Sequence, residues 1–348
     1  MEEYIERLSK FKKPDLDNVE EITAAEYYYD PHCHYSIHEQ LLNDKETMAV
    51  FKGWIEDNSH IIKNKIILDI GCGTGIFSMF AARAGAAHVI SIEWSNIVEH
   101  TKKIIKDNHL ENVITVLRGK VEKIHLPHNI QKVDVIISLW MSYSLFHGGR
   151  LKSVLYARDK WLKSDGHIIP DLAKLYICGV SDDEFRENNM EWWKNVYGYD
   201  MSSLIEDALK PAHHCILSPH KICTNKYELK NINLRTESYK NIIEEVPFQI
   251  TAKINDYVQG FCTHFSVKFS KDLKKREINT DPILQPKLWG QTIYYFKDYI
   301  MIKKKEKIRG SFSFFHITDD SRMLGVIIGV YFHGKMDKLI KMKEFVLQ

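Results

Sequence analysis

The stretch that decides the fold runs from Ile66 to Gly75 and reads Ile-Ile-Leu-Asp-Ile-Gly-Cys-Gly-Thr-Gly. It joins an apolar run, typical of a buried strand, to a carboxylate at Asp69 and three glycines at alternate positions. A helix-like segment follows and ends at Gly85, and the next apolar run, Val89 to Ile92, ends at Glu93. This order of strand, glycine turn, helix, strand and acid predicts a Rossmann-type α/β unit that binds a nucleoside.

The spacing indicates which nucleoside. Glu93 follows Gly73 by twenty residues, where a carboxylate can accept both ribose hydroxyls, and Gly71 and Gly73 let the backbone approach the ligand closely. A dinucleotide fingerprint would need glycine or alanine at position 76, which is Ile76 here. The pattern suits S-adenosylmethionine, with Asp69 facing the amino group of the ligand. A glycine-rich turn without a ligand is the alternative, and the register of Glu93 disfavours it.

Length and composition set the outer limits. With 348 residues, of which 44% are hydrophobic, the chain is long enough for two domains with cores of their own. The 48 Lys and Arg nearly balance the 46 Asp and Glu, so we expect no direct nucleic-acid partner. No apolar stretch approaches the length of a membrane span, and the N-terminus has no signal-peptide core. We therefore expect no membrane association, and a location in the cytoplasm, the nucleus or both.

Cysteine and histidine usage gives no metal or disulfide pattern. The six cysteines lie far apart, with no Cys-x-x-Cys pair, so free buried thiols are expected. Two histidine clusters, around Cys33 and before Cys215, lack ligand spacing on a predictable element. We predict no metal site.

The two halves of the chain have different patterns. In the first half apolar strands alternate with helix-like stretches, as in a parallel sheet, and the first helix has Ile76, Met79 and Phe80 on one face. After Pro170, alternation from Phe261 to Phe269 and several β-branched and aromatic runs predict an antiparallel sandwich or barrel. Between them, residues 182–210 are polar, helix-prone and rich in Trp and Tyr. That segment either packs internally or forms a docking surface.

Several blocks, in the right order, resemble the protein arginine methyltransferase family, type I branch. The blocks are Tyr27-Tyr-Tyr-Asp with Ile37-His-Glu, Leu68-Asp-Ile-Gly-Cys-Gly-Thr-Gly75, Gly119-Lys-Val-Glu122, Leu155-Tyr-Ala-Arg-Asp-Lys-Trp161 and Trp192-Trp-Lys-Asn-Val-Tyr-Gly198. The resemblance runs from about Tyr27 to the C-terminus. It implies an N-terminal helical segment (1–46), a Rossmann-type S-adenosylmethionine-binding domain (47–170) and an antiparallel β-barrel (171–348), with a helical dimerisation arm inserted at about 182–210.

The resemblance also implies roles for particular residues. The expected cofactor contacts are His38, Asp69, Gly71, Gly73, Glu93 on the ribose, Val121, and Glu122 toward the adenine amino group. The expected contacts of the arm are Trp192, Trp193 and Tyr197. A protein substrate or protein partner, and a homodimer or heterodimer through the arm, are implied.

The substrate-binding motifs are degenerate. The family brackets the guanidinium with two glutamates in Ser-Glu-Trp-Met-Gly-Tyr-x-Leu-x-x-Glu, and Leu139 and Gly148 occupy both acid positions here. A guanidinium stays protonated and presents only donors, so a dry pocket that holds it needs carboxylates. Neither His147 nor Arg150 can replace them. At the position of the family's barrel histidine this chain has Leu288. At the position of the arginine that the family uses to meet the carboxylate of the cofactor it has Thr47, and this substitution questions the affinity for the cofactor.

Three hypotheses remain open. In the first, the chain keeps the architecture and the cofactor loop, has little or no arginine methylation activity, and works through binding or dimerisation. In the second, it is an active arginine methyltransferase with acids from elsewhere, of which Glu39 is the nearest candidate in sequence. In the third, it methylates a neutral nucleophile, which a more apolar pocket would accommodate. A search for carboxylates in the pocket separates the first two.

Overall fold

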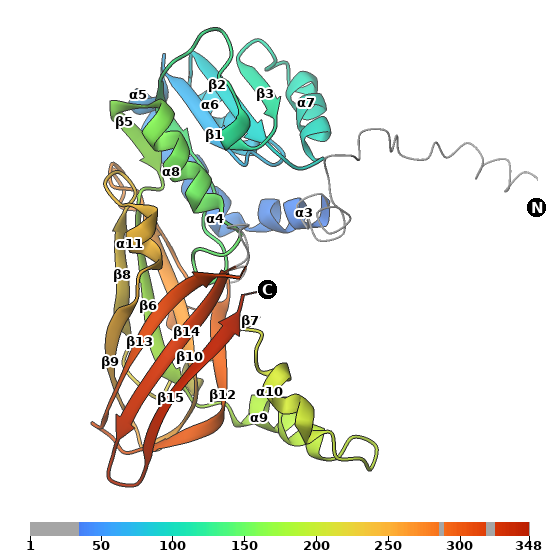
Figure 1. Cartoon of the computed structure of the whole chain (residues 1–348). Helices are drawn as coiled ribbons and strands as arrows, with labels where there is room; N and C mark the ends of the chain where they lie inside the picture. The colour runs from blue at the N-terminus through green and yellow to red at the C-terminus, as the bar shows by residue number, and fades with distance from the viewer. Residues whose placement is uncertain (1–34, 285–288, 318–323, 348) are drawn as a thin grey trace, which may run out of the picture.

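The computed structural model describes residues 35–284, 289–317 and 324–347. An α/β domain is followed along the chain by an antiparallel β domain, into which a projecting helical arm is inserted (Figure 1). Tyr27, Cys33 and Leu288, which the sequence analysis singled out, lie outside the described residues.

The α/β domain contains a five-stranded parallel sheet in the order β3-β2-β1-β4-β5. The order reverses between β1 and β4, and in such a sheet ligands bind beyond the carboxyl ends of the strands at that point. The elements are β1 (Ile66–Ile70), α6 (Ile76–Arg83), β2 (His88–Glu93), α7 (Val98–Asp107), β3 (Ile114–Arg118), η3 (Val121–Lys123), β4 (Val133–Ile137), α8 (Arg150–Trp161) and β5 (Leu162–Ile169).

The apolar face expected for the first helix packs against the core, but it is not the most buried side of the helix. Phe77, Ser78 and Ala81 are the buried residues of α6, whereas Ile76, Met79 and Phe80 are only partly buried. A second helix, α4 (Lys45–Asp57), packs against α6, so α6 is covered on more than its sheet side.

Within residues 35–284, three helices precede the sheet, and α4 links the two domains. They are α3 (Tyr35–Asn43), α4 and α5 (Ser59–Ile62). Asp44 caps α4 by accepting the backbone N–H of Thr47 at 3.2 Å. Phe51, fully buried in α4, stacks on Phe77 of α6 at 4.3 Å and meets Phe269 of the β domain edge-on at 5.4 Å. One aromatic ring thus belongs to the cores of both domains.

The β domain consists of two antiparallel sheets that enclose a common apolar core (Figure 1). One has the order β7-β12-β10-β6-β8, with β11 on β10, and the other the order β15-β14-β13-β9. The strands are β6 (Leu172–Val180), β7 (His213–Cys215), β8 (Tyr227–Asn233), β9 (Val246–Thr251), β10 (Asp256–Lys268), β11 (Glu277–Asn279), β12 (Gln291–Ile302), β13 (Lys307–His316), β14 (Leu324–His333) and β15 (Lys338–Val346), and the short helices are η6 (Pro219–Lys221), α11 (Tyr239–Ile243) and η7 (Pro282–Leu284). The sequence-based expectation of a barrel-like antiparallel domain is confirmed.

The arm leaves the barrel after β6 and projects away from it (Figure 1). It comprises α9 (Asp183–Asn189), η4 (Glu191–Lys194), η5 (Ser202–Leu204) and α10 (Ile205–Ala208). Its base packs on the outer face of β10, where Cys262 joins Met190 and Ile205 in a second buried cluster. Both faces of β10 are therefore buried, although its alternating sequence is typical of a strand with one buried face.

No helix in the described part of the chain is long and apolar enough to cross a membrane. The cysteines within the described ranges, at 72, 178, 215, 223 and 262, are free thiols. No group of three or more His, Cys, Asp or Glu side chains that could hold a metal ion occurs within the described ranges of the chain.

Candidate functional site

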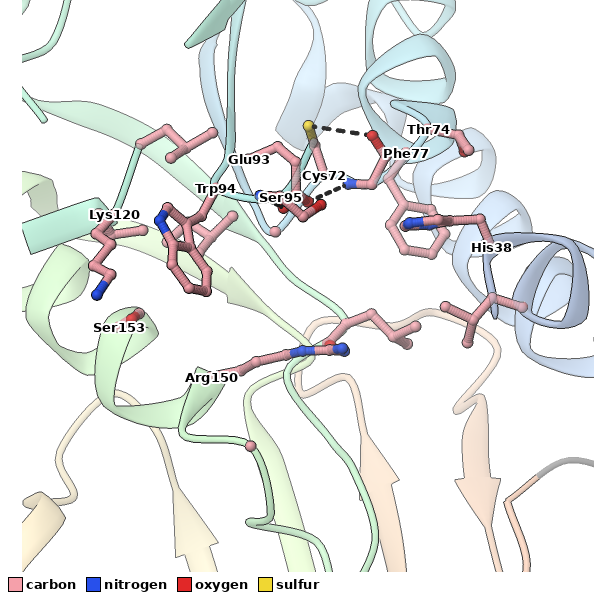
Figure 2. A pocket seen from close by; sticks show the side chains of 18 of the residues that line it. His38, Cys72, Thr74, Phe77, Glu93, Trp94, Ser95, Lys120, Arg150 and Ser153 are labelled. Atoms are coloured by element: carbon pink, nitrogen blue, oxygen red, sulfur yellow. Dashed lines mark hydrogen bonds between the residues drawn. The ribbon is translucent and has the colours of Figure 1, made fainter. Parts of the chain in front are cut away.

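A cavity of about 510 Å³ lies at the carboxyl ends of β1 and β2 (Figure 2). Its wall combines the glycine loop, the residues after β2, the turn at η3, the start of α8, and α3 with α4. Six of the seven cofactor contacts predicted from sequence line it: His38, Gly71, Gly73, Glu93, Val121 and Glu122. The seventh, Asp69, does not.

The glycine loop provides the floor of the cavity. Gly71, Gly73 and Gly75 have φ values of +67°, +53° and +82°, a region that L side chains rarely adopt. A Cβ on Gly73 would lie 3.0 Å from Nδ1 of His38, whereas a Cβ on Gly71 would meet no atom within 4 Å. The loop therefore leaves open space above Gly71, which a ligand can approach closely.

Glu93 is held in place by the backbone. Its Oε2 accepts the N–H of Gly73 at 2.9 Å and its Oε1 accepts the N–H of Ser95 at 2.8 Å. Each carboxylate oxygen keeps a second acceptor site, so the group is oriented and can still accept hydroxyls. The hydroxyl of Ser95 lines the same wall, is buried, and has no partner among the described atoms. A buried polar group of this kind favours a polar ligand.

Asp69 lies behind the glycine loop. Its carboxylate accepts the hydroxyl of Ser78 at 2.5 Å, and Ser78 in turn contacts the hydroxyl of Ser91 at 2.7 Å. Only 1% of the residue is exposed, and burial raises the pKa of the carboxyl to about 7. The contact with a ligand amino group predicted from sequence stays a prediction, since the structure places the carboxylate inside the domain.

The adenine side predicted from sequence gathers around η3. Val121 is buried, and Oε1 of Glu122 accepts the hydroxyl of Ser153 at 2.7 Å. Trp94 adds an aromatic wall, and Nζ of Lys120 lies 4.7 Å from the centre of its ring. Trp94 follows Glu93 directly in sequence, but nothing in its pattern distinguishes it from a core aromatic residue.

The two family acid positions lie at the opposite wall. Leu139 and Gly148 both line the cavity, and apart from Glu93 and Glu122 no carboxylate is found among the described lining residues. Arg150, the first residue of α8, lines the same wall, and its Nη1 donates to the carbonyl of Leu139 at 3.2 Å. Burial and the charge of Arg150 lower the pKa of the neighbouring His147. A guanidinium of the chain itself therefore lines the cavity together with the two positions where the family resemblance implies acids.

The loop that carries these positions is fixed to the barrel. Ser144 and Leu145 have φ values of +48° and +70°. The N–H of Ser144 donates to Oγ1 of Thr292 at 3.0 Å, and its hydroxyl lies 2.8 Å from that of Tyr294. These buried contacts hold the turn in its strained conformation.

Thr47 does not line the cavity. Its hydroxyl accepts the indole N–H of Trp289 from the barrel at 3.2 Å, and the next residue, Met48, lines the cavity in its place. Thr47 is therefore directed to the domain junction, and the question of cofactor affinity that it raised stays open to experiment.

The arm residues predicted from sequence have different environments. Trp192 is 49% exposed and Tyr197 is 95% exposed. Trp193 is half-buried and packs on the cluster at the base of the arm. Its ring also lies 4.7 Å from that of Trp192.

Comparison with known proteins defines the class of protein to which this fold and cavity belong. Residues 67–166 match a family model described as a methyltransferase domain, and residues 171–335 match one described as the arginine methyltransferase oligomerization subdomain. The chain has the fold of an S-adenosylmethionine-dependent methyltransferase.

Relatives narrow this to one family. The chain is 39% identical over 328 residues to protein arginine N-methyltransferase 1 of Caenorhabditis elegans, covering 94% of each protein. It is 40% identical over 325 residues to protein arginine N-methyltransferase 8-B of Danio rerio, covering 93% of this chain and 77% of the relative. The chain belongs to the protein arginine N-methyltransferase family.

Solved structures of the same family have a similar fold. The PRMT1 enzyme–prozyme heterotetrameric complex of Trypanosoma brucei with AdoHcy contains a chain with a TM-score of 0.86 and 31% identity, covering 92% of this chain and 100% of that one. Protein arginine methyltransferase 10 of Arabidopsis thaliana gives a TM-score of 0.80 at 25% identity, covering 91% and 99%.

Proposed function

We propose that this chain binds an S-adenosylmethionine-type nucleoside in the cavity, methylates arginine weakly or not at all, and acts as a subunit of a methyltransferase oligomer. The charge of the cavity wall carries the proposal. Among the described residues that line the cavity, the only carboxylates are Glu93 and Glu122, and both are already engaged by donors of this chain.

The missing acids have a large energetic effect. A substrate guanidinium at this wall would meet Leu139, Gly148 and the cation of Arg150. Leaving a buried charge without its partners costs about 3–5 kcal/mol. At about 1.4 kcal/mol per decade, that corresponds to a loss of hundreds- to thousands-fold.

The nucleoside half of the cavity fits its ligand. Glu93 is positioned for ribose hydroxyls, Trp94 and Val121 offer apolar surface for a base, and Gly71 leaves room for close approach. When bound, S-adenosylmethionine supplies an activated methyl group; the residues of this chain bind and orient it. Beyond Glu93 and Glu122, none of the described residues that line the cavity offers a carboxylate to a cationic acceptor.

The arm supports a role in assembly. Trp192 and Tyr197 expose large aromatic surface far from the barrel core, as protein interfaces do. The T. brucei structure is described as an enzyme–prozyme heterotetramer, and its chain is 31% identical to this one. We propose that this chain likewise combines with a catalytically competent family member. We also propose a cytoplasmic or nuclear location.

A second candidate is methyl transfer to a neutral nucleophile. The cavity lining contains Leu41 and Met48 as well as Leu139, and these side chains would accept an uncharged group. The hypothesis of arginine methylation with substitute acids lacks support. Its candidate acid, Glu39, is exposed and does not line the cavity.

Calorimetric titration with S-adenosylmethionine, followed by radiolabelled methyl transfer to an arginine–glycine-rich peptide, tests the proposal. We expect binding without transfer. Transfer to the peptide by this chain alone would overturn the proposed lack of activity, and transfer to a neutral acceptor would favour the second candidate. If no nucleoside bound, the proposed ligand would be wrong.

A further inference from the structure

Three turns meet at the end of the barrel far from the α/β domain, where Figure 1 shows the turn between β14 and β15. They join β9 to β10 at residues 252–255, β12 to β13 at 303–306, and β14 to β15 at 334–337. Glu306 accepts the backbone N–H groups of Lys303 and Lys335, each at 2.8 Å. Oδ1 of Asn255 accepts the N–H of Lys304 at 2.8 Å. The three turns therefore form one fixed surface, which we call the turn platform.

The turn platform is basic. The three turns, taken with the residue on either side of each, contain seven lysines and three acids. All seven lysines are exposed: Lys253, Lys303, Lys304, Lys305, Lys307, Lys335 and Lys338. None of their ammonium groups lies within 4.0 Å of a carboxylate in the described ranges of the chain.

The three acids of the platform are engaged within the fold. Glu306 holds two of the turns together, as described above. Asp256 accepts the hydroxyl of Ser181 at 2.9 Å, and Asp337 accepts the N–H of Met301 at 3.0 Å. These carboxylates fix the backbone and lower the net charge, but they do not pair with the seven ammonium groups. An excess of positive charge faces the solvent.

Two of the turns also expose an apolar side chain. Ile254 is 45% exposed and Met336 is 57% exposed, and each follows a lysine in the sequence. Exposed aliphatic side chains among lysines are typical of surfaces that lie on membranes. The apolar groups enter the boundary between headgroups and acyl chains, and the ammonium groups meet anionic headgroups.

We propose that the turn platform binds an anionic membrane surface, with Ile254 and Met336 entering the lipid and the lysines contacting the headgroups. Peripheral binding of this kind needs no membrane-spanning helix. It revises the expectation of no membrane association, which rested on the lack of a span and of a signal peptide in the sequence.

The composition of the turns favours lipid over a polyanion in solution. A nucleic acid or an acidic polypeptide would use the lysines and leave Ile254 and Met336 exposed. The three turns contain no aromatic side chain on which a base could stack, and no arginine for a bidentate phosphate contact.

Co-sedimentation of the full chain with phosphatidylcholine vesicles, with and without about 30% phosphatidylserine, tests the proposal. We expect binding to the anionic vesicles alone, and weaker binding when the ionic strength rises from about 0.1 M to about 0.5 M. Replacing Lys303, Lys304 and Lys305 together by Gln should lower the binding constant about tenfold or more. The control replaces Lys102, Lys103 and Lys106 by Gln. It removes the same charge from α7, in the α/β domain (Figure 1), and should change binding less than about twofold.

A second pair of variants tests the apolar side chains. Ile254→Ser with Met336→Ser should weaken binding to the anionic vesicles about tenfold, because less apolar surface enters the lipid. Leu273→Ser with Ile283→Ser changes two side chains that are 74% and 65% exposed outside the platform, and should leave binding unchanged. Thermal unfolding of all the proteins checks that the variants fold.

The other outcomes contradict the proposal. Failure of the folded wild type to bind anionic vesicles overturns it, and so does equal binding to phosphatidylcholine alone. An equal loss in the α7 control would assign the binding to net charge and not to the platform. Tighter binding of RNA or polyglutamate, unaffected by Ile254→Ser with Met336→Ser, would replace lipid by a polyanion as the partner. None of these measurements uses a nucleoside, so their result leaves the proposed function untouched.

Discussion

Asp69 is a carboxyl group that the fold stabilises in its protonated form. Burial raises its pKa to about 7, and Ser78 supplies the hydroxyl that it accepts. In the unfolded chain the pKa returns to about 3.9. The folded state therefore binds more protons than the unfolded state between about pH 4 and pH 7, so the free energy of unfolding falls as pH rises through that range.

Replacing Asp69 by Asn should remove this pH dependence. The amide keeps an acceptor for Ser78 and carries no charge to bury. At about 1.4 kcal/mol per pKa unit, we expect the variant to be more stable than the wild type at alkaline pH by roughly 1–3 kcal/mol. Urea unfolding across the pH range measures this. Asp165→Asn, at an exposed carboxyl, is the control, and a wild-type slope in Asp69→Asn would show that another group titrates.

Restoring the family acids is a second test at the scale of single residues. In the structure Arg150 donates to the carbonyl of Leu139 and lines the same cavity as Gly148, so we expect the glutamates of Leu139→Glu with Gly148→Glu to pair with Arg150 before any substrate arrives. We expect little arginine methylation from this pair alone, and a gain only when Arg150→Met is added. The φ of +85° at Gly148 costs a glutamate about 1 kcal/mol.

Radiolabelled methyl transfer to an arginine–glycine-rich peptide compares the double and triple variants. Equal activity in both would show that Arg150 does not compete for the new acids. Inactivity in both would show that Thr47, Leu288 or the loop geometry also limits the reaction.

Site residues that lie in or next to a recognisable motif could be assigned from the sequence. Residues whose contacts join distant parts of the chain could not. The glycine loop, Glu93, Val121 and Glu122 were assigned to one site and line one cavity. Arg150 was considered only as a failed replacement for the acids, because its contact with Leu139 depends on how the loop folds back. The contact of Thr47 with Trp289 joins residues separated by 242 positions, and no local pattern indicates it.

At the scale of elements, the parallel sheet followed the sequence most closely. The apolar run expected as a strand at 89–92 corresponds to β2 within one residue at each end, and the expected alternation of strands and helices is present, because continuous apolar runs are typical of strands buried on both sides. The local sequence pattern did not indicate how completely α6 and β10 are buried. In both elements a second layer, α4 or the arm, covers a face that the local pattern leaves open.

The two tryptophans of the arm should behave differently when changed. Trp192 is 49% exposed, so Trp192→Glu should disrupt association and leave the fold intact. Trp193 packs on the base of the arm, so Trp193→Glu should also lower the melting temperature. Light scattering and thermal unfolding together separate the two effects. An unchanged oligomer mass for Trp192→Glu would exclude this residue from the interface.

At the scale of the whole molecule, α4 is the junction between the domains. Phe51 contacts Phe77 on one side and Phe269 on the other, and Arg276 of the barrel forms an ion pair with Asp57 at the end of the same helix. The division into two domains could be predicted from composition and pattern. The junction could not, since α4 reads as an ordinary amphipathic helix.

Phe51→Ala should therefore weaken both domains together. A buried phenylalanine truncated to alanine costs about 3–5 kcal/mol. We expect a lower melting temperature and, because the shared ring is lost, unfolding in two separate calorimetric steps. Ile62→Ala, fully buried in α5 and away from these ring contacts, is the control for loss of packing alone. A single sharp transition in Phe51→Ala would show that other contacts couple the domains.

The exposed arm also has a consequence for abundance. A chain that presents Trp192, Tyr197 and Tyr199 to solvent carries a surface of the kind that chaperones bind and proteolytic quality control removes. Association would cover it. We therefore expect an orphan chain to be short-lived, so that the amount of this protein in a cell follows the supply of its partner more closely than the rate of its own synthesis.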